Sequence, residues 1–389
     1  MLAIAITMMT LGQILFSFPQ LLAKYSESKA YLPLALFLLA NGVIALGPII
    51  FSALPEFYDL YIALIFPAFL ALAPLLWLYV EAITSMRAWC WHRKHLIDIM
   101  PIVLGVITAC LLISLSAEQM AMIFAKDSDI EQGYLLVVVL FMFSSMLVWL
   151  LQSAYYLQRI IRRLLNYRIK LKQHFANHEQ RDLAWLSWVL FIVVMIWCLA
   201  FSGLMLTLLR DIDLFSYWFG ALLLLILVWT MAYWGLRQKP GFTEQYLTQT
   251  LPTGDSELIT TVEHKKYQRS ALAQEQAQRI AEKLTASMVQ EKLYLDANIS
   301  LHKLAKHLTI SANYISQTLN QSLGYSFFDF INHWRVEEAK TLLVTSSASV
   351  LDISLQVGFN ARSSFYKVFK KQTGMTPSEY RKSHTHSAI

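Results

Sequence analysis

The sequence predicts an all-α protein in two unlike parts, a membrane-spanning helical domain followed by a smaller helical domain outside the bilayer. Of the 389 residues, 56% are hydrophobic and only 15% are charged, a composition typical of membrane proteins. Uncharged stretches of about 20 residues recur as far as residue 237. Beyond that point charges return every few residues, and apolar residues recur at the 3–4 residue spacing of amphipathic helices.

The predicted membrane domain covers residues 1–237 and contains about seven transmembrane helices. Each predicted span has about 20 residues or more, which crosses roughly 30 Å of hydrocarbon at 1.5 Å per residue. The first span lacks a positively charged start and a small-residue cleavage site, so it is interpreted as a helix and not as a removed signal peptide. The spans lie at about 2–22, 31–52, 60–83, 97–116, 133–157, 184–208 and 213–236.

The positive charges between the spans predict the orientation of the domain. One set of connecting segments is rich in lysine and arginine, above all the segment Arg159–Arg181. The alternate set holds only Lys126 and Arg210 among more numerous acidic residues. Because cytoplasmic segments carry the excess of Lys and Arg, the N-terminus is predicted outside and the C-terminal domain in the cytoplasm, at a bacterial inner membrane.

Four polar side chains within the spans are candidates for function, since polar groups at membrane depth often serve one. They are Gln13, Asn41, Glu81 and Gln152. Glu81 lies near the cytoplasmic end of its span, where it can reach water or a loop arginine, and we expect a structural role for it. The residues of the spans do not locate a sensor pocket.

Signatures of catalysis and of metal binding are missing from the sequence. It contains no HExxH, GxSxG, Walker or GxGxxG pattern. Cys90, Cys110 and Cys198 are scattered, and the histidines have no partners at metal-ligand spacing. We therefore predict no catalytic residue, no metal site and no cofactor, and we expect that the protein is not an enzyme.

Residues 238–262 contain two prolines, two glycines and several threonines, and they are predicted to be a linker to a domain at residues 263–389. Its first helix is predicted at about 263–293, with a core face from Ile280 onward. The earlier part of that helix, about 263–276, could instead pair with its copy in a homodimer.

Two helix-turn-helix units follow. In the first, Ser300 is the expected N-cap of one helix and Ser311 that of the next, which ends at Gly324. Ser326 opens a long joining helix in capping-box style. In the second unit, Gly358 ends one helix and Asn360 is the expected N-cap of the next.

Gly374 ends this last helix, whose buried face is predicted to hold Phe365, Val368 and Phe369. The segment from Thr376 to Glu379 then forms a capping box, with proline at its first helical position. A pair of crossing helices whose second member has a basic polar face is typical of proteins that read a DNA major groove.

The second unit resembles the signature of the AraC/XylS transcription regulators almost throughout, with Ser354 as one departure, since the family usually has alanine there. Residues about 270–383 resemble the whole DNA-binding domain of that family, in which a long helix joins two helix-turn-helix units. The matching residues are Asp352-Ile353, Val357-Gly358-Phe359, Ser364-Phe365, Val368-Phe369-Lys370-Lys371, Gly374-Met375-Thr376-Pro377 and Tyr380-Arg381.

A narrower resemblance is to the subgroup of that family with an N-terminal multi-pass membrane domain. The residues that carry it are Lys266-Tyr267, Ser270, Glu291-Lys-Leu-Tyr-Leu-Asp296 and Asn313-Tyr-Ile-Ser-Gln317.

The resemblance implies a set of residues that contact DNA. Two recognition helices about 34 Å apart can enter successive major grooves. The implied base-contacting residues are Asn313, Ser316, Gln317, Arg362, Ser363, Tyr366 and Lys367. Phosphate contacts are expected from Lys303, Lys306, Lys370, Lys371, Arg381 and Lys382, while ordinary surface charge remains an alternative for each. In the joining helix, Arg335 and Glu337 are expected to be structural.

The function indicated is that of a membrane-anchored, one-component transcription factor. Its cytoplasmic domain would bind double-stranded promoter DNA and activate or repress transcription, with RNA polymerase as a further partner. The bilayer holds the other domain, which would sense a signal, such as a small or lipid-like ligand. Proteolysis within 238–262 could instead release the regulator. The alternative is a transporter or membrane enzyme whose C-terminal module docks a partner protein.

Overall fold

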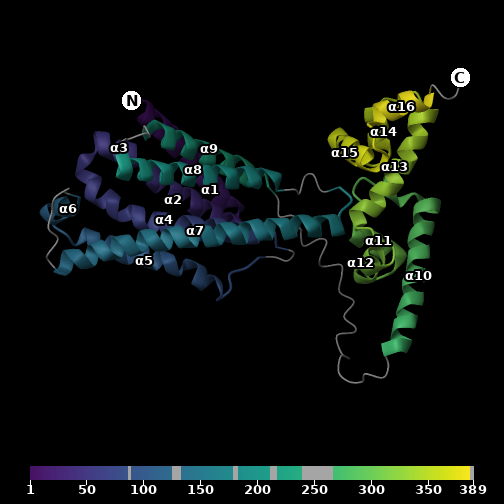
Figure 1. Cartoon of the computed structure of the whole chain (residues 1–389), viewed down its shortest axis with the longest axis horizontal. Coiled ribbons are helices and arrows are strands. Elements are labelled where there is room, and N and C mark those ends of the chain that lie inside the picture. The colour runs from purple at the N-terminus through teal and green to yellow at the C-terminus, as the bar shows by residue number, and fades with distance from the viewer. Residues whose placement is uncertain (86–88, 125–132, 178–182, 211–216, 239–265, 386–389) are drawn as a thin grey trace. The chain divides into compact units, whose positions relative to one another are not determined.

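The computed structural model describes residues 1–85, 89–124, 133–177, 183–210, 217–238 and 266–385 (Figure 1). This part of the chain is helical, and its only β contact is an isolated antiparallel bridge between Phe175 and Ser300. The α-helices are α1 Leu2–Ala23, α2 Tyr31–Ala45, α3 Gly47–Ala53, α4 Tyr58–Ile83, α5 His95–Ile113, α6 Ala117–Phe124, α7 Gly133–His174, α8 Ala184–Arg210, α9 Tyr217–Arg237, α10 Lys266–Glu291, α11 Leu301–Leu308, α12 Ala312–Gln321, α13 Phe327–Thr345, α14 Val350–Gln356, α15 Arg362–Thr373 and α16 Pro377–Thr385. Short 3₁₀ turns are η1 Lys24–Ser26, η2 Pro55–Phe57 and η5 Leu293–Leu295.

Two compact units make up the fold. Unit 1 consists of Met1–Leu165 and Leu183–Glu244, and unit 2 of Asn166–Asp182 and Gln245–Ile389. The division differs from the one expected from the sequence, which assigned all of 1–237 to the membrane domain. The predicted linker, 238–262, lies outside the described residues apart from Gln238.

Unit 1 is a bundle of apolar helices. In it, α4 packs against α2 and α5, and α1 packs against α2 and α9. Six helical segments in the described residues are long and apolar enough to cross a membrane, counting α2 with α3 as one. The remaining predicted span, the sixth at 184–208, corresponds to α8, of which Trp185–Ile196 forms a shorter apolar segment.

The fifth predicted span is longer than expected. The sequence predicts a span at 133–157 followed by a basic loop, and this prediction of a loop is wrong for residues 158–174, because α7 continues without interruption for 42 residues to His174. Its second half, LQRIIRRLLNYRIKLKQH, contains good helix formers and neither glycine nor proline. Since α7 crosses from residues of unit 1 to residues of unit 2, it is a structural element of both.

Unit 2 contains the two helix-turn-helix units, α11–α12 and α14–α15, joined by α13. One apolar core surrounds the first helix-turn-helix unit and includes Leu284 and Met288 of α10, both 0% exposed. These two residues confirm the core face of α10 predicted from Ile280 onward. A second core surrounds the second helix-turn-helix unit and includes Phe365 and Phe369. Because α13 supplies Phe330 and Ile331 to the first core and Val336 and Leu343 to the second, it fixes the two together.

Most of the predicted helix ends in unit 2 are confirmed. The Ser300 hydroxyl accepts a hydrogen bond from the Lys303 amide (3.2 Å), and Ser326 accepts one from the Asp329 amide (3.1 Å). Thr376 and Glu379 form the reciprocal capping box. Ser311 is the N-cap residue of α12, although its side chain makes no capping hydrogen bond.

One predicted helix end is wrong. Asn360 is not an N-cap, because α15 begins one residue later, with Ala361 at the cap position and no side-chain cap. A cap absent from the predictions lies at Ser349, whose hydroxyl accepts a hydrogen bond from the Asp352 amide (3.1 Å).

Candidate nucleic-acid interface

The outer face of α12 carries the residues predicted to read bases in the first unit. Asn313 and Gln317 are exposed and Ser316 is partly exposed, while Ile315 and Leu319 on the opposite face are buried in the core. The side chains of α12 are hydrogen-bonded along the helix, since Gln317 Nε2 donates to Gln321 Oε1 (3.0 Å). The three predicted residues therefore form one uncharged polar surface of hydrogen-bond donors and acceptors, the groups that can bond to base edges.

The corresponding face of α15 is cationic. Arg362, Ser363 and Lys367 are exposed, and Phe365 and Phe369 are fully buried behind them. This separation follows from helical spacing, because residues three and four apart share a face. The structure thus brings the predicted residues of each recognition helix together on one exposed surface.

Tyr366 organises the end of this surface. Its hydroxyl lies 3.3 Å from Ser378 Oγ and accepts a hydrogen bond from Arg362 Nη2 (2.9 Å). The bonds with Ser378 and then with Arg362 lower the pKa of Tyr366. The Arg362 guanidinium also lies over the tyrosine ring, 4.9 Å from its centroid. Tyr366 therefore restricts Arg362 to a position at the edge of the helix before any DNA is bound.

The residues predicted to contact phosphates fall into two groups. Lys306, Lys370 and Lys382 are exposed and have no ion pair with the described residues. The other three make contacts within unit 2: Lys303 pairs with Asp296 (3.1 Å), Lys371 with Asp329 (3.4 Å), and Arg381 donates to the carbonyls of Leu343 (3.1 Å) and Ala348 (2.7 Å). Of the six, the first three have the freest ammonium groups.

Arg335, at the middle of α13, is fully buried, with 0% of its surface exposed. Its guanidinium donates to the carbonyls of Tyr294 (2.7 Å) and Asp296 (2.9 Å) and to Asn177 Oδ1 (3.0 Å). Burial lowers the pKa of Arg335 to about 9, so the side chain stays charged at neutral pH. Glu337, on the outer side of α13, is exposed and pairs with Lys340 (2.6 Å). The expected structural role of Arg335 is confirmed by these bonds.

The segment that follows α7, Phe175-Ala176-Asn177, lies between the two helix-turn-helix units. Phe175 forms the β-bridge with Ser300, the N-cap of α11. Ala176 is 0% exposed within the first core. Asn177 Nδ2 donates to the carbonyls of Ala297 (2.6 Å) and Gly358 (3.0 Å). Three consecutive residues from the end of α7 thus contact the start of one unit and the turn of the other.

No motif in the sequence marked this segment, because its partners lie 120 to 181 residues away along the chain. The one available signal was Arg335. A buried arginine requires acceptors, and the local sequence of α13 supplies only Asn332 Oδ1 (3.4 Å).

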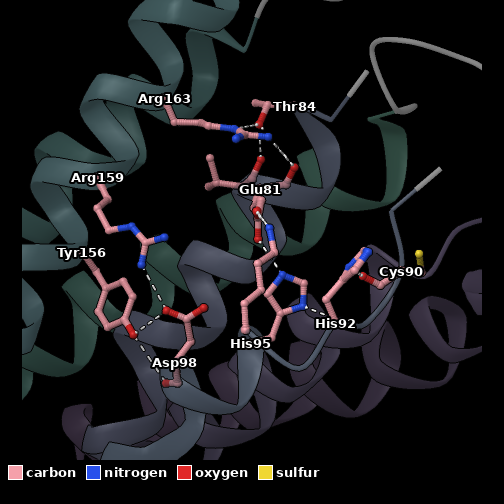
Figure 2. Close-up of polar contacts among 11 residues, drawn as sticks. Glu81, Thr84, Cys90, His92, His95, Asp98, Tyr156, Arg159 and Arg163 are labelled. Carbon is pink, nitrogen blue, oxygen red and sulfur yellow. Dashed lines mark hydrogen bonds and ion pairs between the residues drawn. The ribbon is translucent and has the colours of Figure 1, made fainter. Parts of the chain in front are cut away.

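A second set of polar contacts holds α7 within unit 1 (Figure 2). Arg159 Nη1 and the Tyr156 hydroxyl both donate to Asp98 Oδ1 of α5, at 3.1 and 2.9 Å. One turn further on, Arg163 donates to Thr84 Oγ1 (2.9 Å) and to the carbonyl of Glu81 (3.4 Å) at the end of α4. The end of α7 in unit 1 is therefore bonded to two neighbouring helices.

Glu81 itself is paired with Lys94 (3.0 Å) and His95 (3.1 Å). Its expected structural role agrees with these pairs, although its partners are a lysine and a histidine, whereas the sequence suggested water or a loop arginine.

Comparisons with known proteins identify the C-terminal region. The family described as a helix-turn-helix domain matches residues 304–383. An uncharacterized HTH-type transcriptional regulator of Staphylococcus aureus strain COL is 36% identical over 90 residues, which are 23% of this chain and 12% of that protein. The melibiose operon regulatory protein of Escherichia coli K12 is 32% identical over 87 residues, which are 22% of this chain and 29% of that protein.

Among solved structures, the C-terminal domain of the two-component response regulator yesN from Fusobacterium nucleatum is 34% identical. The match covers 26% of this chain and 97% of that one, with a TM-score of 0.24. The chain therefore spans less than a third of the Staphylococcus aureus and Escherichia coli regulators. It spans nearly all of the solved yesN domain.

The C-terminal helices of unit 2 are thus a DNA-binding domain of the kind found in transcription regulators, built from two helix-turn-helix units on one joining helix. More narrowly, it is an AraC-type domain, as its sequence signature indicated. Regulators of this class are not enzymes, in agreement with the expectation from the sequence.

Proposed function

We propose that this protein is a membrane-anchored transcription factor whose affinity for promoter DNA is controlled by unit 1 through α7. The AraC-type domain supplies DNA binding, with α12 and α15 entering successive major grooves. Unit 1 supplies the anchor in a bacterial cytoplasmic membrane and the response to a signal. The observation that carries the proposal is the position of Asn177, at the end of a helix that belongs to both units.

The geometry of the contacts supports such control. Asn177 bonds to Gly358, in the turn of the second helix-turn-helix unit, and to Ala297, close to the start of the first. It also bonds to Arg335, in the helix that joins them. Two recognition helices bind together only when their spacing matches the groove repeat, about 34 Å. A shift of residues 175–177 would therefore change DNA affinity by changing the spacing of the two helix-turn-helix units.

Control of this kind needs two states with different affinities for DNA. In one state the Phe175–Asn177 segment lies between the two units, as described above. In the other state it would leave that place, and Arg335 would lose one of its acceptors. Since an unsatisfied buried group costs about 1–3 kcal/mol, the two states can differ by an amount that a bound ligand can reverse.

Sequence-selective DNA binding is tested first, with the full chain in lipid nanodiscs. An unbiased selection of DNA sites would supply the target, and binding would then be titrated at several salt concentrations. Arg362→Ala should weaken binding by about 1–3 kcal/mol and relax selectivity at one base position. Lys370→Ala should weaken binding to all sequences alike and reduce the salt slope by about one.

If Arg362→Ala leaves both the affinity and the base selectivity of DNA binding unchanged, α15 is excluded as a reading helix. A full chain that binds no DNA sequence selectively would instead favour the docking module considered from the sequence.

The control through α7 is tested by Asn177→Ala, with Asn298→Ala as the matched control. Asn298 lies in the same region of unit 2 and is exposed. Asn177→Ala should change DNA affinity about fivefold or more, the range of typical allosteric couplings, and should speed amide hydrogen exchange of residues 171–177. Asn298→Ala should alter neither. If exchange speeds up while the DNA affinity stays the same, the contact does not control binding.

A further inference from the structure

Unit 1 contains a cavity of about 750 Å³ between its helices. Its walls come from α1, α2, α3, α4, α7, α8 and α9, so that helices distant in sequence line it together. Sites for small molecules have volumes of roughly 300–1,000 Å³ and are mostly apolar, with a few polar groups that fix orientation. The volume of this cavity is within that range.

The chemistry of the lining excludes a charged occupant. Aromatic and aliphatic side chains predominate, among them Phe37, Phe69 and Trp149, and the described lining residues include no Asp, Glu, Lys or Arg. An ion moved into such surroundings would lose its hydration without gaining a partner. An uncharged, mainly apolar molecule would lose little hydration free energy on entering the cavity.

A few polar side chains line the cavity. Asn41, Thr7 and Thr10 line it from α2 and α1, and their exposed fractions are 1%, 2% and 1%. Asn41 Nδ2 donates to the carbonyl of Phe37 (2.8 Å), and the Thr10 hydroxyl donates to the carbonyl of Ile6 (2.9 Å). Among the described residues, the bond donated by Nδ2 is the one hydrogen bond of the Asn41 side chain, and its Oδ1 is left to accept a bond at the cavity wall. An amide oxygen without a donor in apolar surroundings is destabilising, so the cavity favours an occupant that brings one.

We propose that this cavity binds an uncharged lipophilic molecule with one hydroxyl or amide N–H group, which donates its hydrogen bond to Asn41. The apolar part of the ligand lies along the aromatic and aliphatic wall. The existence of this site is independent of DNA binding, whereas its regulatory role rests on the function proposed above.

The cavity also touches the helix that reaches unit 2. Tyr156 lines the cavity, and its hydroxyl shares Asp98 Oδ1 with Arg159, the first anchor of α7 in unit 1 (Figure 2). An occupant that moves the Tyr156 ring therefore disturbs the bond that holds Arg159. The ligand is in this way coupled to the position of α7 and, through it, to Asn177.

Binding is tested on the full chain in phosphatidylcholine nanodiscs with a photoreactive probe, an uncharged long-chain alcohol that carries a diazirine. Illumination followed by peptide mass spectrometry locates the crosslink. We expect labelling on α1, α2 or α7, with competition by the unlabelled alcohol. A hydrocarbon probe of equal length without the hydroxyl should label at least fivefold less, and the corresponding fatty acid anion should compete poorly.

A cavity-filling variant gives a matched comparison. Gly220 lines the cavity, and a Cβ added there meets no atom within 4 Å. Gly12 on α1 is equally open but is not among the lining residues. Gly220→Phe should reduce labelling at least threefold and Gly12→Phe should leave it unchanged. Asn41→Leu should remove the preference for the alcohol over the hydrocarbon probe.

Equal labelling of the two glycine variants, or equal labelling by the two probes, overturns the proposal, because the cavity would then hold only acyl chains of bilayer lipid. Failure of the regulatory role is a separate result. Specific labelling with an unchanged DNA affinity would retain the site and reject its control of DNA binding.

Discussion

Gly358, a single residue in the turn of the second helix-turn-helix unit, has a backbone that only glycine adopts readily, with φ of +93°. A Cβ at this position would lie 2.7 Å from the carbonyl oxygen of Leu295 and 2.9 Å from that of Tyr294. Its own carbonyl accepts the hydrogen bond from Asn177 (3.0 Å). The residue thus combines a left-handed turn with close backbone packing.

Gly358→Ala should therefore destabilise the protein by at least about 3 kcal/mol, since backbone strain and a steric clash add together. Gly374→Ala is the matched control. It also has a positive φ (+78°), but open space surrounds its Cβ position, so its cost should be only about 1 kcal/mol. Chemical unfolding monitored by hydrogen exchange in unit 2 measures both. Equal costs would mean that the contacts with Leu295 and Tyr294 relax freely.

Glu338 of α13 predicts a pH dependence. Its carboxylate accepts hydrogen bonds from Lys292 Nζ (2.8 Å) and the Tyr294 hydroxyl (3.0 Å). The bond from Lys292 has the largest effect and lowers the pKa of Glu338 below its ordinary value of 4.5, despite partial burial. Because the folded pKa is depressed, the stabilisation is complete above pH 4.5 and is lost as the pH falls through the folded value.

Glu338→Gln should reduce stability at pH 7 by about 1 kcal/mol or less, since Lys292 is half exposed and solvent screens the pair. The difference from the natural protein should shrink below about pH 4.5. Thermal unfolding between pH 7 and 3.5 checks this. Glu275→Gln, which breaks a largely exposed pair with Arg279, should show no such pH-dependent difference.

At the scale of single elements, α7 is distinguished by polar anchors within its second half and just after its end. Arg159 and Arg163 bond to α5 and α4 in unit 1, and Asn177, just after the helix, bonds to unit 2. Every turn of the helix between the anchors is fixed by its own hydrogen bonds. Under the function proposed above, a displacement at one anchor should therefore reach the other.

A double-mutant cycle tests this transmission. Asp98→Asn weakens the Arg159 anchor and should alter DNA affinity. Ile169→Pro interrupts the helix at a cost of about 3 kcal/mol, and in its presence Asp98→Asn should have no further effect on DNA affinity. Ile169→Ala is the control, because Ile169 is 57% exposed and loses little packing. Additive effects of Asp98→Asn and Ile169→Pro would contradict the role of α7.

The elements of unit 2 were largely predictable from sequence, whereas the contacts of α7 were not. Local rules sufficed for Ser300, Gly358 and the capping box at Thr376, because caps and turns depend on residues within one turn of each other. The place of Asn177 depends on hydrogen-bond partners more than 100 residues away along the chain. In unit 1 the long uncharged apolar runs predicted helices, but which faces line the cavity depends on packing that no local pattern records.

At the scale of the whole molecule, the DNA-binding unit is made from two separate stretches of chain, Asn166–Asp182 and Gln245–Ile389. The sequence placed a boundary at residues 238–262 because composition changes there, and composition does not reveal that an earlier segment returns to the domain. This arrangement bears on the release of the regulator by proteolysis, the alternative considered from the sequence.

Cleavage within 238–262 should leave the C-terminal fragment attached. A protease site engineered there, cut in isolated membranes, should leave most of the fragment in the membrane pellet, since Phe175 to Asn177 still hold it. Addition of Asn177→Ala should increase the amount in the supernatant. If the cut alone releases the fragment of the natural sequence, the contacts around Arg335 are too weak to retain it, and release by cleavage becomes the favoured mechanism.

The same two-part construction has a consequence for how the protein is made. Asn177 and Arg335 are 158 residues apart, and a ribosome adding about 5–20 residues per second takes roughly 8–30 seconds between them. During that interval the segment after α7 has been synthesised but the helix that receives it has not. The Phe175–Asn177 segment must then remain soluble without its partners. It can bind only after Arg335 has been synthesised, because Arg335 donates a hydrogen bond to Asn177. Folding of the DNA-binding unit thus ends with the capture of a segment made long before, and a nascent chain stalled between the two residues should be more susceptible to proteases after α7 than the finished protein.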